Sequence, residues 1–259
     1  MKIEKEVSRL DYPILAILGV FLSLVVWSLL TYTGIVKPLF LPTPTEVINA
    51  IIRLFTQFDF LSDVLVSIYR ILIGFLISVI IAVPLGILLG TIRQVEALLE
   101  PIVAFVRYIP TSAFVPLSIL WFGIGDVEKF FIIFIGVAPY LLLLVADVVQ
   151  NVKKELMEAA RTLGATKIQV YTNAIIPSSL PGIWDSIEIM FGVAWTFIIL
   201  AEIIAATSGL GHVLIQSQRF LQTSNVIAVI IVIGLLGLVA DYLFKYGYKK
   251  LFPWSEKVR

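Results

Sequence analysis

The sequence predicts an all-α membrane protein with six transmembrane helices. Hydrophobic residues make up 59% of the 259 positions, charged residues only 14%, and the mean hydropathy is +1.02, which is more apolar surface than a water-soluble domain can bury. The apolar residues fall into runs separated by polar connections, and crossing a bilayer takes about 20 such residues. The runs cover about 13–36, 63–91, 97–121, 127–149, 182–206 and 226–246.

The composition also excludes several classes of function. The formal net charge of +1 gives no indication of nucleic-acid binding. There is no cysteine, and His212 is the only histidine, so a metal site is not expected. No Gly-x4-Gly-Lys phosphate loop occurs. We therefore expect this chain to bind no cofactor. If a nucleotide drives the protein, that nucleotide must sit on another chain.

The first apolar run is expected to be a retained span. Residues 1–12 carry Lys2, Lys5 and Arg9 ahead of it, as in a secretory signal peptide. However, a signal peptide has an apolar region of only about 7 to 15 residues. The run here is longer and lacks a small-residue cleavage site.

A short helix is predicted after this span. In the string LPTPTEV, Thr43 suits the N-cap, Pro44 the first helical position, and Glu46 completes a capping box. Apolar residues gather on one side of the helix and polar residues on the other, which favours a helix that lies in the outer interface. The apolar side holds Val47, Ile48, Ile51, Ile52 and Phe55, and the polar side Asn49, Arg53 and Gln57.

The second span has a pattern for close helix packing, whereas the third has residues that interrupt a helix. In the second, small residues recur at every fourth position, which lets another helix approach closely; they are Gly74, Ser78, Ala82, Gly86 and Gly90. Arg70 near its start is costly in lipid. The third span is interrupted at Pro110 and again at Pro116, and irregular backbone at membrane depth is tolerated only against protein or water. We therefore expect the third span to be interior.

The polar segment between the fourth and fifth spans predicts a helix, a glycine elbow and a second helix. Leu156, Ala159, Ala160 and Leu163 share one helix face. Gly164 follows where a helix ends in the left-handed region. Thr166 can cap a second helix, which we expect to end before Pro177. The residues alone are compatible with a surface for another protein or with an ordinary cytoplasmic loop.

The distribution of Lys and Arg predicts the orientation. One face of the predicted bundle has only Lys37, Arg53, Lys129 and Arg219. The other face, with both termini and the 150–177 loop, holds the remainder of the connecting cations, including Lys2, Lys5, Arg9, Arg93, Lys153, Lys154, Arg161, Lys167, Lys245, Lys249, Lys250, Lys257 and Arg259. By the positive-inside rule, both termini and this loop are cytoplasmic.

The loop resembles a known signature. Glu158, Ala159, Ala160, Gly164 and Pro177 follow the Glu-Ala-Ala, Gly, Leu-Pro pattern of the permease subunits of ATP-binding-cassette (ABC) importers. Ala174 and Ile176 stand where that family usually has a larger aliphatic residue and a Leu. The resemblance implies that these residues form the coupling helices that dock onto the ATPase.

Three longer strings narrow the resemblance. RYIPTSAFVPLSILWFGIGD at 107–126, EAARTLGAT at 158–166 and AEIIAATSGLG at 201–211 look, together with LPTPTEV, like permeases of the nitrate, sulfonate, taurine and bicarbonate importers. The resemblance implies a type I importer fold in the cell membrane and a permease homodimer. It also implies two ATPase subunits that bind ATP and Mg, and an extracytoplasmic substrate-binding protein.

The expected organisation follows from these predictions. Residues 1–12 form a cytoplasmic N-terminus, and 13–62 the first span with the outer interfacial helix. Residues 63–250 form the permease core, which contains the coupling segment 153–177, and 251–259 form a cytoplasmic tail.

A translocation path is predicted at Arg107, Tyr108, Pro110 and Glu202. Ionisable residues within spans usually face the bundle interior or a water path, and Arg107 adjoins a break in the backbone. Arg107 would attract a small polar or anionic solute. The alternative is that Arg107 pairs with Glu188 or Glu202 and only fixes helix packing.

Two other classes of function fit the sequence less well. A membrane-embedded enzyme would need a catalytic motif such as HExxH or GxSxG, and none occurs. An ATP-independent channel or ion-coupled secondary transporter accounts for the spans but gives the polar helical pair no role.

Overall fold

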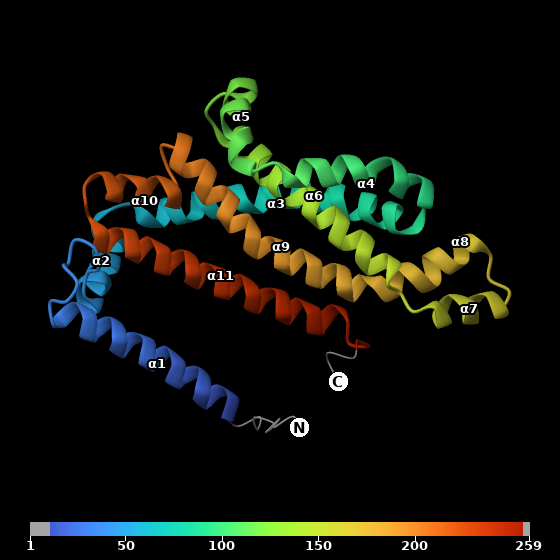
Figure 1. Ribbon diagram of the computed structural model, residues 1–259, viewed down its shortest axis with the longest axis horizontal. Helices are drawn as coiled ribbons and strands as arrows, with labels where there is room; N and C mark the ends of the chain where they lie inside the picture. The colour runs from blue at the N-terminus through green and yellow to red at the C-terminus, as the bar shows by residue number, and fades with distance from the viewer. Residues whose placement is uncertain (1–10, 256–259) are drawn as a thin grey trace. The chain divides into compact units, whose positions relative to one another are not determined.

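The computed structural model describes residues 11–255, and this range forms helices and connections without a β-strand. In chain order (Figure 1) its helices are α1 (Asp11–Tyr32), α2 (Pro44–Gln57), α3 (Phe60–Thr91), α4 (Arg93–Tyr108), η1 (Thr111–Phe114), α5 (Val115–Phe122), α6 (Asp126–Gln150), α7 (Lys154–Thr162), α8 (Lys167–Val170), η2 (Tyr171–Ile175), α9 (Ile176–Ala205), α10 (Leu210–Arg219) and α11 (Thr223–Leu251). Helix η1 is a 3-10 helix and η2 a π-helix.

The six-span prediction is confirmed. Five helices are long and apolar enough to cross a membrane, if α8, η2 and α9 are counted as one continuous helix. The bent pair formed by α4 and by η1 with α5 is the sixth candidate span.

The chain divides into two compact units. The smaller unit combines the chain up to Phe60 with Val213–Ile231, and so holds α1, α2, most of α10 and the start of α11. The larger unit comprises Leu61–His212 and the chain from Val232 onward, and so holds α3 to α9 and the rest of α11.

In the smaller unit, the start of α2 has the predicted cap. The hydroxyl of Thr43 accepts a hydrogen bond from the backbone N–H of Glu46, and the carboxylate of Glu46 accepts one from the N–H of Thr43. The indole N–H of Trp27 donates to the carbonyl oxygen of Pro42 at 3.0 Å. These bonds fix the direction in which α2 leaves α1.

The apolar side of α2 is divided. Val47, Ala50 and Leu54 are buried within the unit, whereas Ile48 and Ile52 are exposed. Apolar residues cover too much of the helix circumference to face one surface together. Only part of the expected apolar face is therefore free to lie in a membrane interface.

The larger unit is built around α6 and α9, which pack against each other (Figure 1). Val137 and Leu141 of α6 and Ala194 and Ile198 of α9 are fully buried. The segment from α7 to η2 joins the end of α6 to the start of α9. A force on that segment therefore acts on both helices.

The small-residue ridge of α3 packs closely against α6, as its spacing predicts. A Cβ added at Gly86 would lie 2.7 Å from the carbonyl oxygen of Leu142, and one at Gly90 would lie 2.8 Å from that of Ala146. Ser78, on the same face, is fully buried. The two backbones are in direct contact, which only small side chains permit.

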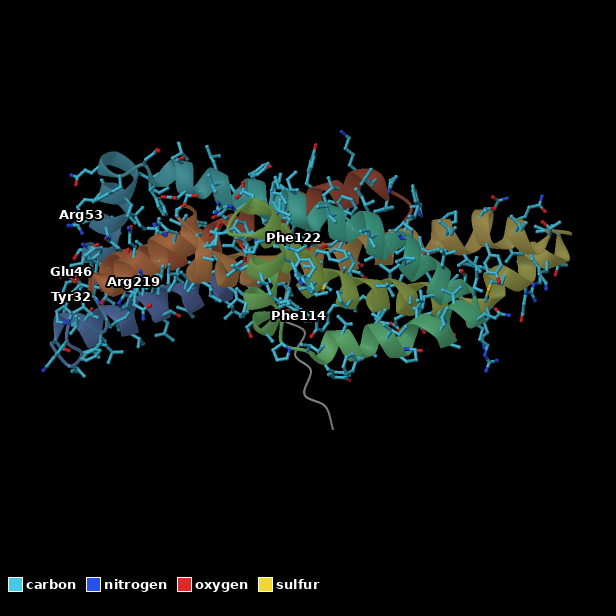
Figure 2. All side chains as sticks on the ribbon, turned by 90° about the horizontal axis from the view of Figure 1, so that it is seen from above. Tyr32, Glu46, Arg53, Phe114, Phe122 and Arg219 are labelled. Carbon is cyan, nitrogen blue, oxygen red and sulfur yellow. The ribbon has the colours of Figure 1, made fainter. Side chains whose placement is uncertain are left out.

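The third predicted span is broken at the expected proline. Helix α4 ends at Tyr108, the chain bends by 89°, and η1 leads into α5. Figure 2 labels Phe114 in η1 and Phe122 at the end of α5. Phe114 packs on a buried cluster that contains Val115.

Its own chain does not make α4 interior, as the third span was expected to be. None of its residues is buried within the chain. The helix lies against α6, where Tyr140 Oη donates to the carbonyl oxygen of Arg107 at 2.9 Å and Gln150 Nε2 donates to Glu96 Oε1 at 2.9 Å. Because the bend turns α4 away from α5, its other faces have no cover.

Candidate functional site

The segment between α6 and α9 contains the predicted glycine elbow. Helix α7 ends at Thr162, and Gly164 has a φ of +85°, which favours glycine. The N–H of Gly164 donates to the carbonyl oxygen of Arg161 at 2.9 Å, and the N–H of Ala165 donates to that of Ala160 at 3.1 Å. These two bonds form a Schellman motif. The elbow therefore has a defined geometry.

The second helix of the pair begins as predicted but does not end as predicted. The Thr166 hydroxyl accepts from the N–H of Gln169, and the Gln169 side chain accepts from the N–H of Thr166. The expected end before Pro177 is wrong, because η2 carries the helix directly into α9. The π-helical turn shifts the hydrogen-bond pattern just ahead of Pro177, which lacks an N–H.

Much of the surface of α7 and the elbow is uncovered. No residue of α7 is buried, the Leu163 side chain is 88% exposed, and Ile168 is 73% exposed. On the same helix Glu158 and Ala159 are exposed and Ala160 is half-buried. The elbow therefore presents two large apolar side chains that its own chain does not cover.

Arg107, Tyr108 and Pro110 lie together at the break after α4. Tyr108 and Pro110 are exposed, and Arg107 is half-buried. The guanidinium carbon of Arg107 lies 5.2 Å from the ring centre of Tyr108 and 5.8 Å from that of Tyr140. Within the described residues no carboxylate pairs with Arg107. Its charge lies over aromatic faces instead.

Glu202 lies in a buried network whose cation is Arg70. Arg70 Nη1 donates to Glu202 Oε1 at 2.9 Å, the N–H of Gly211 donates to Oε2 at 2.9 Å, and the Ser67 hydroxyl lies 2.8 Å from both carboxylate oxygens. Glu202 is 0% exposed and Arg70 only 6%. The alternative pairing of Glu202 with Arg107 therefore does not occur here.

The guanidinium of Arg70 links three parts of the unit. Its Nε donates to Asp126 Oδ1 at 2.7 Å, and Nη1 donates to the carbonyl oxygen of Ser208 at 2.8 Å. Asp63 of α3 accepts from the N–H of Gly209 at 2.6 Å. These bonds tie together the start of α3, the start of α6 and the connection after α9. Asp126, whose side chain is 46% exposed, is the most exposed member of the network.

Sequence reasoning missed the role of Arg70, although a signal was present. Ser67, Arg70 and Gly74 are spaced by three and four residues, so they continue the small-residue face of α3 toward its N-terminus. It also missed a pair in α6: Lys129, counted among the cations of the outer face, is buried and donates to Glu128 Oε2 at 3.1 Å.

A further pair of acids occurs within the spans. Glu188 of α9 and Asp241 of α11 line a cavity of about 260 Å³, and Lys245 Nζ lies 2.7 Å from Asp241 Oδ2. Across residues 11–255, no group of three or more His, Asp or Glu side chains is placed to hold a metal ion.

Comparison with known proteins gives consistent matches. The family of binding-protein-dependent transport system inner membrane components matches residues 82–252. The chain is 32% identical over 242 residues to the taurine transport system permease protein TauC of Escherichia coli, covering 91% of this chain and 88% of TauC. It is 28% identical over 248 residues to the bicarbonate transport system permease protein CmpB of Synechococcus elongatus, covering 92% and 89%.

The fold matches a solved transporter chain. A chain of the inward-facing MetNI methionine ABC transporter superposes with a TM-score of 0.64 at 17% identity, covering 83% of this chain and 98% of that one. At this identity the match supports the fold alone.

Proposed function

The chain belongs to the family of binding-protein-dependent transport system inner membrane components, and on this premise we propose that it is the membrane permease of an ATP-driven importer. Its relatives make it an ABC importer permease of the taurine, sulfonate and bicarbonate type. The proposed cargo is a small polar or anionic solute. A homodimer of this chain would work with two ATPase subunits, which bind ATP and Mg, and with an extracytoplasmic binding protein.

The observation that carries the proposal is the coupling segment. Glu158, Ala159, Ala160, Gly164 and Pro177 would hold it against an ATPase on the cytoplasmic side. The elbow at Gly164 is defined by its own backbone bonds, and Leu163 and Ile168 beside it are exposed. A rigid, uncovered apolar tip suits docking into a groove of a partner protein.

The mechanism would be alternating access. ATP binding would bring the two ATPase subunits together, the docked segments would move with them, and α6 and α9 would move as a pair because the segment joins both. Transport of this kind needs two packings of similar energy, each favoured by a different ligand state.

The proposed path runs past the break after α4. Arg107, Tyr108 and Pro110 would contact the solute, since Arg107 has no carboxylate partner and α4 has faces that the chain leaves uncovered. The proposed role of Glu202 is indirect: with its oxygens engaged by Arg70, Ser67 and Gly211, it would position the end of α9 beside the path.

Co-purification tests this function. Leu163→Asp should abolish recovery of the ATPase with the permease in detergent, because a charge would then enter the apolar contact. Ile92→Asp is the matched control, since Ile92 is also exposed but lies at the N-cap of α4, where Asp is favourable. Solute uptake by the purified chain without any ATPase would overturn the proposal in favour of a channel or ion-coupled transporter.

A further inference from the structure

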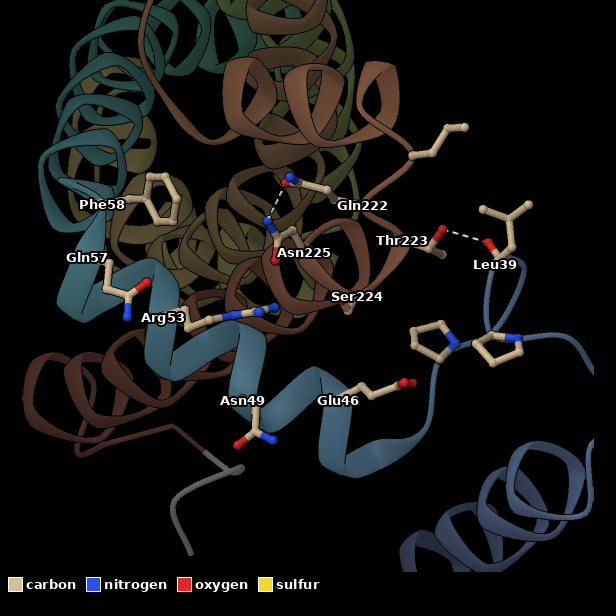
Figure 3. A pocket seen from close by; sticks show the side chains of 13 residues that line it. Leu39, Glu46, Asn49, Arg53, Gln57, Phe58, Gln222, Thr223, Ser224 and Asn225 are labelled. Carbon is tan, nitrogen blue, oxygen red and sulfur yellow. Dashed lines mark hydrogen bonds between the residues drawn. The ribbon is translucent and has the colours of Figure 1, made fainter.

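The smaller unit contains a polar groove that the proposed function leaves without a role. It has a volume of about 660 Å³ and lies between α2 and the segment where the α10–α11 connection enters α11 (Figure 3). Side chains from successive turns of α2 form one wall, and consecutive residues at the start of α11 and just before it form the other. The first wall holds Glu46, Asn49, Arg53 and Gln57, and the second holds Leu221, Gln222, Thr223, Ser224 and Asn225.

The cation in this groove is unpaired. Arg53 is exposed, projects toward the opposite wall (Figure 3), and has no hydrogen bond or ion pair among the described residues. Glu46 is the acid of the same wall, and its carboxylate accepts a hydrogen bond from the N–H of Thr43 at 2.8 Å in the capping box of α2. Figure 2 shows Glu46 and Arg53 at the same end of the unit. The groove therefore offers a free guanidinium to an incoming anion.

The opposite wall is braced. Thr223 Oγ1 donates to the carbonyl oxygen of Leu39 at 2.6 Å, and Asn225 Nδ2 donates to Gln222 Oε1 at 2.8 Å. Leu221 has a φ of +55°, an unusual conformation for a residue other than glycine, and it is the one such residue in the described range. Backbone held in such a conformation is concentrated at functional sites. The shape of the groove is thus set before any ligand arrives.

The rim of the groove is apolar. Leu221 is 70% exposed, and Phe58 and Leu39 are also exposed. Arginine and large apolar side chains around a preformed polar hollow are the composition of protein interaction sites, in which a few anchors supply most of the binding energy. A phospholipid headgroup is also an anion, but its binding would not require the wall opposite α2 to be fixed in advance.

The side of the membrane follows from the proposed function. If the coupling segment is cytoplasmic, α9 crosses the bilayer after it, and the start of α11 with the residues just before it lies outside. We propose that this groove docks the extracytoplasmic solute-binding protein, through an acidic side chain that enters it and pairs with Arg53. The proposal rests on the importer function and names the contact on the outer face.

Binding measurements on the assembled transporter test the proposal. The permease with its ATPase is placed in nanodiscs of phosphatidylcholine, and the affinity of the binding protein encoded beside it is measured with Arg53, Arg53→Gln and Arg53→Glu. We expect about tenfold weaker binding for Arg53→Gln and a larger loss for Arg53→Glu, because a like charge then meets the acidic side chain. The affinity of the unaltered complex should fall as salt is raised.

Controls separate the outcomes. Arg219→Glu, an exposed charge reversal of the same unit outside the groove, should leave the affinity within about twofold. ATP hydrolysis without binding protein should be unchanged by Arg53→Glu, which shows that the complex is folded. Unchanged affinity for the binding protein in both Arg53 variants would overturn the docking site. So would Arg53 variants that keep this affinity and lose only their binding to phosphatidylglycerol vesicles. If the unaltered permease recovers neither ATPase nor binding protein, the importer function itself fails.

Discussion

The two ends of the α6 and α9 pair are built on opposite principles. At one end, Arg70 and Glu202 are buried and each is satisfied by several partners, which join α9 to α3 and to the start of α6. At the other end, Leu163 and Ile168 are exposed, and the geometry is set mainly by local hydrogen bonds of the elbow and of the cap at Thr166. The first region is held together by partners within the chain, whereas the second leaves two large apolar side chains on a defined frame open to contact.

The largest effect should come from breaking the satisfied end. Arg70→Met would leave the carboxylate of Glu202 buried without its counter-charge, which costs about 3–5 kcal/mol. We expect the purified protein to lose most of its yield and to melt at a clearly lower temperature in detergent. Arg219→Met, at an exposed position on α10, should change the free energy of unfolding by about 0.5 kcal/mol or less. Equal melting temperatures for the two variants would show that the network contributes nothing to stability.

The contact between α3 and α6 gives the next effect. Gly86→Val would place a Cβ 2.7 Å from the carbonyl oxygen of Leu142, and since that oxygen belongs to a helix backbone, the two helices must separate. The expected cost is about 1–3 kcal/mol. Gly234→Val in α11, where no atom lies within 4 Å of the added Cβ, should be tolerated. Thermal melting of the two variants measures the difference, and a loss of stability in Gly234→Val alone would contradict the close contact.

The uncovered end should respond in function more than in stability. Gly164→Val forces a β-branched residue to a φ of +85°, which costs about 1–2 kcal/mol. We expect it to reduce the ratio of solute uptake to ATP hydrolysis. Gly123→Val is the matched control, because Gly123 has a φ of +72° with open space around it but lies in the turn before α6. If both variants keep normal coupling, the elbow is not the element that transmits the movement.

Local patterns predicted much of this fold, and long-range partners account for what they left out. Residues close in the sequence determine three features: the cap at Thr43, the elbow at Gly164 and the break at Pro110. These features could therefore be predicted from the sequence alone. The partner of Arg70 lies 132 positions away at Glu202, and several acids were equally compatible with each cation. Pro177 was misjudged for a different reason: a π-helical turn has no sequence signature that separates it from an ordinary helix turn.

The same reasoning applies to the interior position predicted for α4. Two prolines indicated a protein-covered path, and the break is present, but no residue of α4 is buried by its own chain. Cover from a second copy would complete it in the proposed homodimer. A sequence cannot say whether cover comes from the same chain or from another.

The last variant concerns Arg107, which is half-buried and has no carboxylate partner among the described residues. Its guanidinium meets the rings of Tyr108 and Tyr140 at 5.2 and 5.8 Å, contacts worth about 0.5–1 kcal/mol each at an exposed site. Arg107→Gln should therefore lower the free energy of unfolding by no more than about 2 kcal/mol, and the variant should still recover the ATPase. Uptake by the reconstituted transporter should nevertheless fall by about tenfold, the result of losing about 1.4 kcal/mol of solute attraction.

Arg93→Gln is the control, because Arg93 is exposed and lies at the other end of α4; this variant should leave uptake intact. Because a packing role would lower stability and leave uptake per folded complex unchanged, the two measurements together decide whether Arg107 lies on the path.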